Sequence, residues 1–191
     1  MLSEKANSTV EIRWHGRGGQ GAVTSAELVA HAAIAEGKFA QAFPSFGPER
    51  RGAPVLAFNR ISDKQIRIRS AVEHPDIVVV LDPRLMDFID ATAGLKDEGM
   101  LLINTKKSIA AIKSEYNIKH RVGVVNATTI ALEILKVNIV NTTILGLLVR
   151  ATDIVKLESF EVLLQERFGA AAERNLAACK RAYQEAIVEE K

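Results

Sequence analysis

A glycine-rich segment is the first part of the chain whose residue types and spacing could bind a ligand. Gly16-Arg17-Gly18-Gly19-Gln20-Gly21 matches the pattern G-x-G-x-x-G. It follows residues 10–15, which alternate apolar and polar as in a strand, and precedes apolar residues at helical spacing from Ala22 onward. Glycines in such a loop permit a tight turn and the close approach of a ligand, and the N–H groups that open the helix point toward an anion. These six residues are therefore candidates for cofactor binding.

Two more specific interpretations of this loop are a dinucleotide-binding site and a loop that binds no ligand. A dinucleotide site also requires an acidic residue about 20 positions downstream, which binds the ribose hydroxyls. Residues 41–44 read Gln-Ala-Phe-Pro, and the next carboxylate, Glu49, lies beyond a proline-rich loop. This disfavours a classical NAD site. A loop that serves only tight packing between strand and helix, without a ligand, remains open.

A second segment, Phe46-Gly47-Pro48-Glu49-Arg50-Arg51-Gly52-Ala53-Pro54, holds charged residues on a loop stiffened by prolines. Paired arginines suit phosphate or carboxylate groups, which they bind through two parallel hydrogen bonds. Alternatively, Glu49 pairs with one arginine at the surface or across a subunit contact. Phe46, Glu49, Arg50 and Arg51 are therefore candidates for contact with a coenzyme or with another subunit.

The other reactive side chains have ordinary structural explanations. Cys179 falls on the apolar stripe of the last expected helix, which predicts a buried thiol. His15 could contact a ligand or simply be hydrogen-bonded at the end of a strand. Asp82 follows a buried strand, where a catalytic carboxylate could lie, but capping of the next helix explains it. The histidines lack the spacing of metal ligands, so we expect no metal site on this chain. The sequence also offers no Ser-His-Asp or Cys-His pairing, so we expect no catalytic residue.

Several elements must position these segments. Apolar runs predict buried strands, and apolar residues three and four apart predict helices. A hairpin is expected around Ser62-Asp63-Lys64, and Asn141 is expected to cap a helix that contains Ile144 and Leu148. The expected strands are 10–15, 55–61, 65–71, 77–81, 100–103 and 122–125, and the clearest expected helices run from Ala22 to a stop at Gly37, over 160–168, and over 172–186.

Length and pattern together predict the fold class. The 191 residues suit one domain, residues 1–191, with residues 1–9 as a loose N-terminal extension. Strands followed by mixed strands and helices predict an α/β protein. We expect layered helices around a mixed, largely parallel sheet, with an antiparallel hairpin and a helical C-terminus.

Composition excludes several classes of protein. The 25 basic and 23 acidic side chains nearly balance, and only 5% of residues are aromatic, which argues against a nucleic-acid partner. One cysteine excludes a disulfide framework and a cluster ligated by cysteines of this chain. Charges interrupt every apolar segment before it reaches the ~20 residues of a membrane span, so we expect a cytoplasmic protein without a membrane partner.

Taken together, the two loops resemble a known family. Gly16–Val23 and Pro44–Pro54, supported by Arg60-Ile61-Ser62 and by residues 141–146 (Asn-Thr-Thr-Ile-Leu-Gly), are similar to the gamma subunits of the 2-oxoacid:ferredoxin oxidoreductases. The resemblance extends from about residue 10 to the C-terminus. Phe46 and Arg50-Arg51-Gly52-Ala53 resemble the pyruvate and branched-chain members more than the oxoglutarate or indolepyruvate members.

The resemblance implies a division of labour among subunits. The complete enzyme oxidatively decarboxylates a 2-oxoacid, releases acyl-CoA and CO2, and reduces ferredoxin. Thiamine diphosphate, Mg2+, [4Fe-4S] clusters and coenzyme A would be used on or with the alpha, beta and delta subunits. This chain would hold no cofactor alone, would support assembly and the coenzyme A side of the site, and would be inactive in isolation.

Other functions remain to be separated from this one. Pyruvate, giving acetyl-CoA, is the favoured substrate, and a branched-chain 2-oxoacid is the alternative within the family. A stand-alone Rossmann-like dehydrogenase that binds NADP, with Arg50 or Arg51 on the 2′-phosphate, is an alternative outside it. A purely structural interaction module would differ only in that the two loops contact no ligand.

Overall fold

The computed structural model describes residues 9–45, 52–68 and 70–190. Residues 1–8 of the expected extension, together with Phe46, Glu49, Arg50 and Arg51, lie outside these ranges. The elements in chain order are β1 (Val10–Arg17), α1 (Ala22–Ala35), β2 (Phe39–Pro44), β3 (Pro54–Ser62), β4 (Ile77–Val80), the 3-10 helix η1 (Pro83–Asp87), β5 (Met100–Asn104), α2 (Ile109–Tyr116), β6 (Arg121–Val125), α3 (Ala127–Ile134), α4 (Thr143–Ala151), α5 (Phe160–Phe168), the 3-10 helix η2 (Gly169–Ala171), α6 (Ala172–Glu185) and β7 (Ile187–Val188).

One sheet of seven strands organises the described residues, in the order β2-β3-β1-β4-β5-β6-β7. The central strands β1, β4, β5 and β6 are parallel to one another. At one edge β2, β3 and β1 pair antiparallel, and β7 adds an antiparallel strand at the other edge. The mixed α/β fold is therefore confirmed. Its antiparallel hairpin is formed by β2 and β3, whereas the hairpin expected around Ser62-Asp63-Lys64 is not formed, because residues 63–68 contain no strand.

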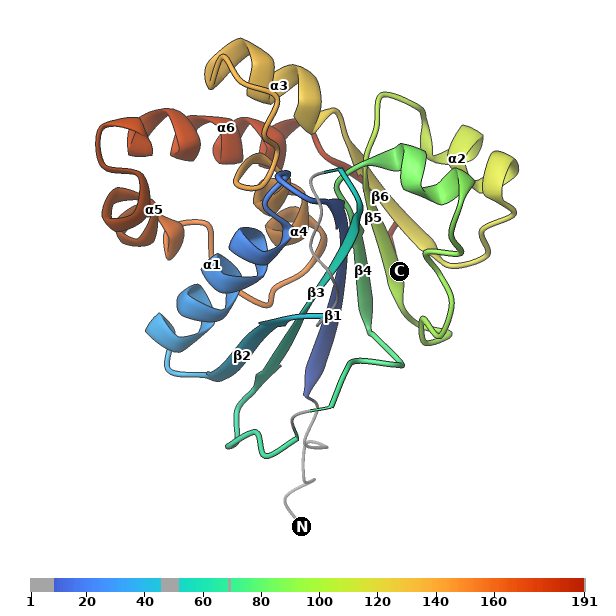
Figure 1. Ribbon diagram of the computed structural model, residues 1–191, viewed down its shortest axis with the longest axis horizontal. Helices are drawn as coiled ribbons and strands as arrows, with labels where there is room; N and C mark the ends of the chain where they lie inside the picture. Colours follow the sequence, from blue (N-terminus) through green and yellow to red (C-terminus); the bar gives the residue numbers. More distant parts are fainter. Residues whose placement is uncertain (1–8, 46–51, 69, 191) are drawn as a thin grey trace.

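Helices cover both faces of the sheet, which makes three layers (Figure 1). Successive side chains of a strand point to opposite faces, so Val79 joins a large apolar core with α1, α3, α4, α5 and α6. Its neighbours Val78 and Val80 join a smaller core with Ile112 of α2. Burial on both faces explains why β4, β5 and β6 read as continuous apolar runs. None of the described helices combines the length and the apolar character that crossing a bilayer requires.

Beneath β1 and β3, the face opposite α1 buries charged side chains instead. Arg60 is 2% exposed and donates to Glu11 Oε1 at 2.7 Å and to the carbonyl oxygen of Ser70 at 2.8 Å. Arg13 donates through Nη2 to the carbonyl oxygens of Ala91 at 3.1 Å and Ala93 at 2.6 Å. These bonds tie the segments after β3 and after η1 to the sheet.

The predicted strand over residues 65–71 is wrong. Ile66 and Ile68 alternate with arginines as in a strand, yet residues 65–68 form no strand and Ile68 is exposed. The intended partner, β3, already pairs with β1 on one side and β2 on the other. The alternation is a local property of the chain, whereas a strand in a sheet also needs a neighbouring strand whose backbone groups are still unpaired.

Two predicted helix ends had different outcomes. Gly37 ends α1 as expected, because Lys38 N donates to Ala33 O and Gly37 N to Ile34 O in a Schellman motif. Asn141 does not cap α4. The residue before that helix is Thr142, whose N–H donates to Asn141 Oδ1. The sequence also gave no indication of the short helix α2 or of β7.

Candidate functional site

The glycine loop and the end of the second motif lie side by side. β1 pairs with β3 up to Arg17 opposite Pro54. Beyond this pair, Gly18 N donates to Ala53 O at 2.9 Å, and Gly52 N donates to Gly18 O at 3.2 Å. The antiparallel pairing thus brings together the two segments that carry the family resemblance.

The side chain of Gln20 stabilises the glycine loop through hydrogen bonds at both ends of its amide. Its Oε1 accepts from Arg17 N at 2.8 Å, and its Nε2 donates to Asp82 Oδ2 at 3.2 Å. Gly19 and Gly21 have φ angles of 91° and 81°, a region that favours glycine. A side chain at Gly21 would also place its Cβ 2.7 Å from Asn141 Nδ2. The glycines therefore serve backbone conformation and close packing.

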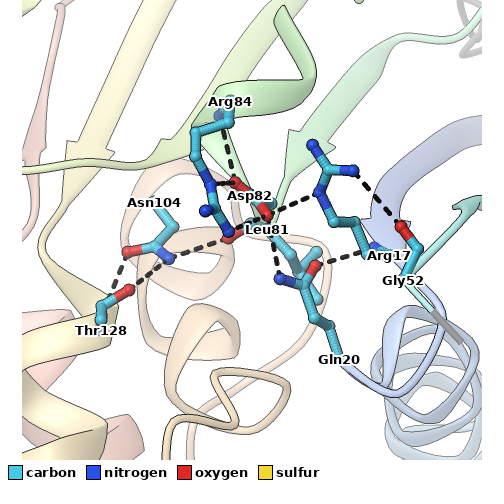
Figure 2. Close-up of polar contacts among 8 residues, drawn as sticks. All are labelled: Arg17, Gln20, Gly52, Leu81, Asp82, Arg84, Asn104 and Thr128. Atoms are coloured by element: carbon cyan, nitrogen blue, oxygen red, sulfur yellow. Dashed lines mark hydrogen bonds and ion pairs between the residues drawn. The ribbon is translucent and has the colours of Figure 1, made fainter.

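Four side chains form what we call the Asp82 group: Arg17, Gln20, Asp82 and Arg84 (Figure 2). Asp82 Oδ2 accepts from Arg17 Nε at 2.9 Å and from Arg84 Nη2 at 3.0 Å. Its Oδ1 accepts from Arg84 N and Nε, both at 3.1 Å, so it also caps η1 as expected. Burial alone would raise the pKa of Asp82, but the hydrogen bonds from Arg84 and Arg17 outweigh it and hold the pKa at about 2.

Asn104 and Thr128 extend this polar group along the edge of the sheet (Figure 2). Asn104 Nδ2 donates to Leu81 O at 2.8 Å and to Thr128 Oγ1 at 2.9 Å, and Thr128 N donates to Asn104 Oδ1 at 3.1 Å. Sequence analysis missed Arg84, Asn104 and Thr128. The available signal was that Asp82, Asn104 and Asn126 each follow or end one of the parallel strands β4, β5 and β6.

The Asp82 group lies where the direction of strand order reverses. After β1 the chain builds β2 and β3 on one side, and from β4 onward it builds on the other. Crevices at such a point, outside the carboxyl ends of the strands, are the usual ligand sites of open α/β sheets. A cavity of about 320 Å³ is lined by Gln20, Asp82 and Arg84. A second of about 440 Å³ continues past Arg84, Asn104 and Thr128 toward α2.

His15 and Cys179 are structural in this arrangement. His15 is buried and its Nε2 accepts from Arg13 Nε at 3.1 Å. Burial, and then the charge of Arg13, lower the pKa of His15 to about 4, so the ring is neutral at pH 7. Burial also raises the pKa of the Cys179 thiol to about 12. Among the described residues, no three histidine, cysteine or acidic side chains gather as a metal site would require.

Comparisons with known proteins agree with the sequence resemblance. The family model described as pyruvate ferredoxin/flavodoxin oxidoreductase matches residues 11–185. The "Pyruvate/ketoisovalerate oxidoreductases common subunit gamma" of Pyrococcus furiosus is 52% identical over 181 residues, which cover 94% of this chain and 98% of that protein. "Pyruvate synthase subunit PorC" of Thermotoga maritima is 45% identical, covering 94% and 96%.

Solved structures point the same way. The crystal structure of pyruvate oxidoreductase subunit PORC from Thermotoga maritima superposes with a TM-score of 0.84 at 41% identity, covering 95% of this chain and 99% of that one. These relatives do not support the alternative of a stand-alone dehydrogenase that binds NADP. The chain belongs to the pyruvate ferredoxin/flavodoxin oxidoreductase family, in which it is a gamma subunit of a 2-oxoacid:ferredoxin oxidoreductase complex.

Proposed function

We propose that this gamma subunit serves a pyruvate enzyme, where it supports assembly and forms part of the coenzyme A side of the site. Relatives named for pyruvate at 45–52% identity support the choice of substrate. The relatives named for both pyruvate and ketoisovalerate make a branched-chain 2-oxoacid enzyme the second candidate. The alpha, beta and delta subunits are the proposed partners, and ferredoxin is the proposed electron acceptor.

The cofactors of the reaction are assigned to the other subunits. A [4Fe-4S] cluster needs several thiolates, whereas the one cysteine here is fully buried and has its pKa raised to about 12. Thiamine diphosphate with Mg2+ and the clusters would supply decarboxylation and electron transfer there. The residues of this chain would bind and orient the anionic groups of coenzyme A.

The observation that carries the proposal is the junction of the two motifs beside the Asp82 group. Arg17 Nη1 donates to Gly52 O at 3.3 Å, so the residue that directly follows Arg50-Arg51 lies against Arg17. We therefore propose that Arg50 and Arg51 supply further positive charge at this edge, with Phe46 and Glu49 in contact with coenzyme A or another subunit. Gly16–Gly21 would present their backbone to the same ligand.

The charges of the Asp82 group suit a phosphate. Two arginines and one carboxylate leave a net positive charge, and the side chains of Arg17 and Arg84 are 26% and 74% exposed. Within the described part of the chain, Arg17 Nη2 and Arg84 Nη1 have no hydrogen-bond partner. Each could donate to a phosphate oxygen while Asp82 holds the rest of the guanidinium in place. Such a charge-assisted bond contributes roughly 1.5–3 kcal/mol.

The test uses the assembled complex with Arg17→Gln, and separately Arg50→Gln and Arg51→Gln. We expect the Michaelis constant for coenzyme A to rise about ten- to a hundredfold, while the constant for pyruvate stays unchanged. Arg67→Gln, at an exposed position away from the Asp82 group, is the matched control.

Gel filtration of each variant complex separates a ligand contact from a subunit contact. A complex that dissociates while its coenzyme A constant holds would assign the loops to assembly alone. If both affinity and assembly match those of the unmodified complex in all three variants, the proposed site is wrong. Purification of the native complex, with identification of the co-eluting chains, tests the subunits and the acceptor.

A further inference from the structure

A separate cavity lies between the segment after α3, the end of α5 at Phe168 and the first turn of α6. Its volume is about 350 Å³, and its lining is mostly apolar. It is lined by Leu135, Val137, Ile139, Asn141, Phe168, Ala171, Arg174 and Asn175. Asn138 and Val140, which alternate with this lining, face the cavity beside Asp82 instead. One short segment thus separates two cavities of different character.

The rim of this cavity exposes large apolar side chains. Val137 is 47% exposed and Ile139 40%, and Leu132 of α3 is 48% exposed. Leu132 does not line the cavity, so the exposed apolar side chains of this region are not all confined to it. Lys136 holds a φ of 62°, an unfavourable conformation for a residue other than glycine, directly before Val137. Contiguous exposed apolar surface of this kind marks sites of interaction with other proteins.

The polar groups of the cavity are hydrogen-bond donors. Asn141 is only 8% exposed, and its Oδ1 accepts from Thr142 N at 2.8 Å. Its Nδ2 donates to no group within residues 9–45, 52–68 and 70–190. Asn175, in contrast, uses both ends of its amide, with Thr142 Oγ1 at 2.7 Å and Ala171 O at 2.9 Å. The Asn141 amide nitrogen therefore remains available to an acceptor, and it is not fully enclosed by the protein.

Two cations lie at or next to this cavity. Arg174 lines it, and Lys136 directly precedes Val137, another lining residue. Neither forms an ion pair with any other described residue. An occupant should therefore combine a large apolar group with a carboxylate or a carbonyl oxygen.

We propose that this cavity seats a segment of another subunit of the complex, which inserts a large apolar side chain next to an acidic residue. The apolar side chain would pack on Val137, Ile139 and Phe168, and the carboxylate would approach Arg174. Val137 and Ile139 line the cavity and are still 47% and 40% exposed, so apolar surface extends from the cavity to the outside of the protein, which favours a protein segment over a small molecule. The inference rests on the proposed assembly of this chain with other subunits, but it does not involve the Asp82 group.

The test measures the affinity of the full gamma chain for the remaining subunits, with Ile139→Ser and Arg174→Glu as separate variants. We expect the dissociation constant to rise roughly ten- to thirtyfold for each, as for residues at the centre of an interface. The affinity of the unmodified chain should fall as salt is raised, and Arg174→Glu should remove part of that dependence. Val162→Ser, a 66% exposed position on α5 that does not line the cavity, and Arg67→Glu are the matched controls.

The outcomes distinguish this inference from the proposed function. If the unmodified chain does not bind 2-oxoacid oxidoreductase subunits at all, the proposed assembly is wrong, and this inference is wrong with it. If it binds and both variants bind equally well, only the docking site is wrong. Self-association of the gamma chain that Ile139→Ser abolishes, with unchanged affinity for the other subunits, would assign the cavity to a second copy and overturn the proposal. Circular dichroism of each variant confirms that these exposed substitutions leave the fold intact.

Discussion

Arg13 and Arg60 lie beneath the antiparallel half of the sheet, whereas Arg17 and Arg84 lie at the carboxyl ends of β1 and β4. The buried pair directs its donors to partners within the chain: a carboxylate, a histidine nitrogen and backbone carbonyl oxygens. The pair at the strand ends shares one carboxylate, Asp82, and each member keeps a terminal nitrogen without a partner among the described residues.

The difference separates structural charge from charge that can bind a ligand. A buried guanidinium is stable only when its donors are satisfied, so Arg13 and Arg60 hold loops onto the sheet. At the strand ends, Arg17 and Arg84 are partly exposed, so the proposed anion could reach their remaining donors. Substitutions in the first pair should therefore change stability, and substitutions in the second should mainly change binding.

The largest effect on stability is expected for Arg60→Met. The substitution leaves the Glu11 carboxylate without its cation and removes donors from Ser70 O and Ala71 O. Breaking a buried ion pair costs about 3–5 kcal/mol, and partial exposure of Glu11 places this case near the lower end. Urea unfolding of the gamma chain measures the loss. Glu11→Gln added to Arg60→Met should recover part of it, and a loss below about 1 kcal/mol would mean that the pair is not structural.

The next effect is a dependence of stability on pH that arises from His15. Its pKa is about 4 in the folded chain, against an ordinary value of 6.5, because burial and the Arg13 charge oppose protonation. The unfolded chain therefore binds more protons than the folded chain between these values, and stability falls as the pH drops from about 6.5 to 4. The loss should be about 2–3 kcal/mol.

His15→Gln should remove this dependence of stability on pH, because glutamine does not titrate. The glutamine side-chain oxygen can still accept from Arg13, so the contact itself is kept. Unfolding free energies measured at several pH values provide the test, and His31→Gln, at an exposed position, is the control. An unchanged slope between pH 6.5 and 4 in His15→Gln would contradict the assignment.

Asp82→Asn should have a smaller effect, in a different pH range. The pKa of this carboxyl is depressed to about 2, so the stability it contributes is complete above about pH 4 and is lost as the pH falls toward 2. At pH 7 we expect a loss of about 1–2 kcal/mol, because Arg17 and Arg84 lose their shared countercharge. The difference from the unmodified chain should shrink on acidification from pH 4 to pH 2. A difference that is constant over this range would assign the effect to packing.

Arg84→Gln should change stability least. Its side chain is 74% exposed, and Asp82 keeps Arg17 as a partner, so the loss should be the smallest of the four and should decrease in high salt. In the assembled complex the same variant should nevertheless raise the Michaelis constant for coenzyme A by about tenfold. A large loss of stability with unchanged coenzyme affinity would reverse the distinction between the two pairs of arginines.

Sequence alone determined the strands and helices whose signals are local. Residues 77–81, 100–103 and 122–125 are continuous apolar runs because both faces of those strands are buried, and the spacing of apolar residues located α1, α5 and α6. It also indicated the glycine loop and the helix-capping role of Asp82. The family resemblance of the two loops needed only their residue types and separation.

Tertiary structure decided which residues meet. Residues 65–71 alternate like a strand, but the described residues among them, 65–68, 70 and 71, form none. The neighbouring strand β3 already pairs with β1 on one side and β2 on the other, which the local pattern does not reveal. Arg17 and Asp82 are 65 positions apart, and only the parallel pairing of β1 with β4 brings their side chains within 2.9 Å. Local patterns report burial and backbone preference, whereas the polar site depends on strand order, which long-range pairing sets.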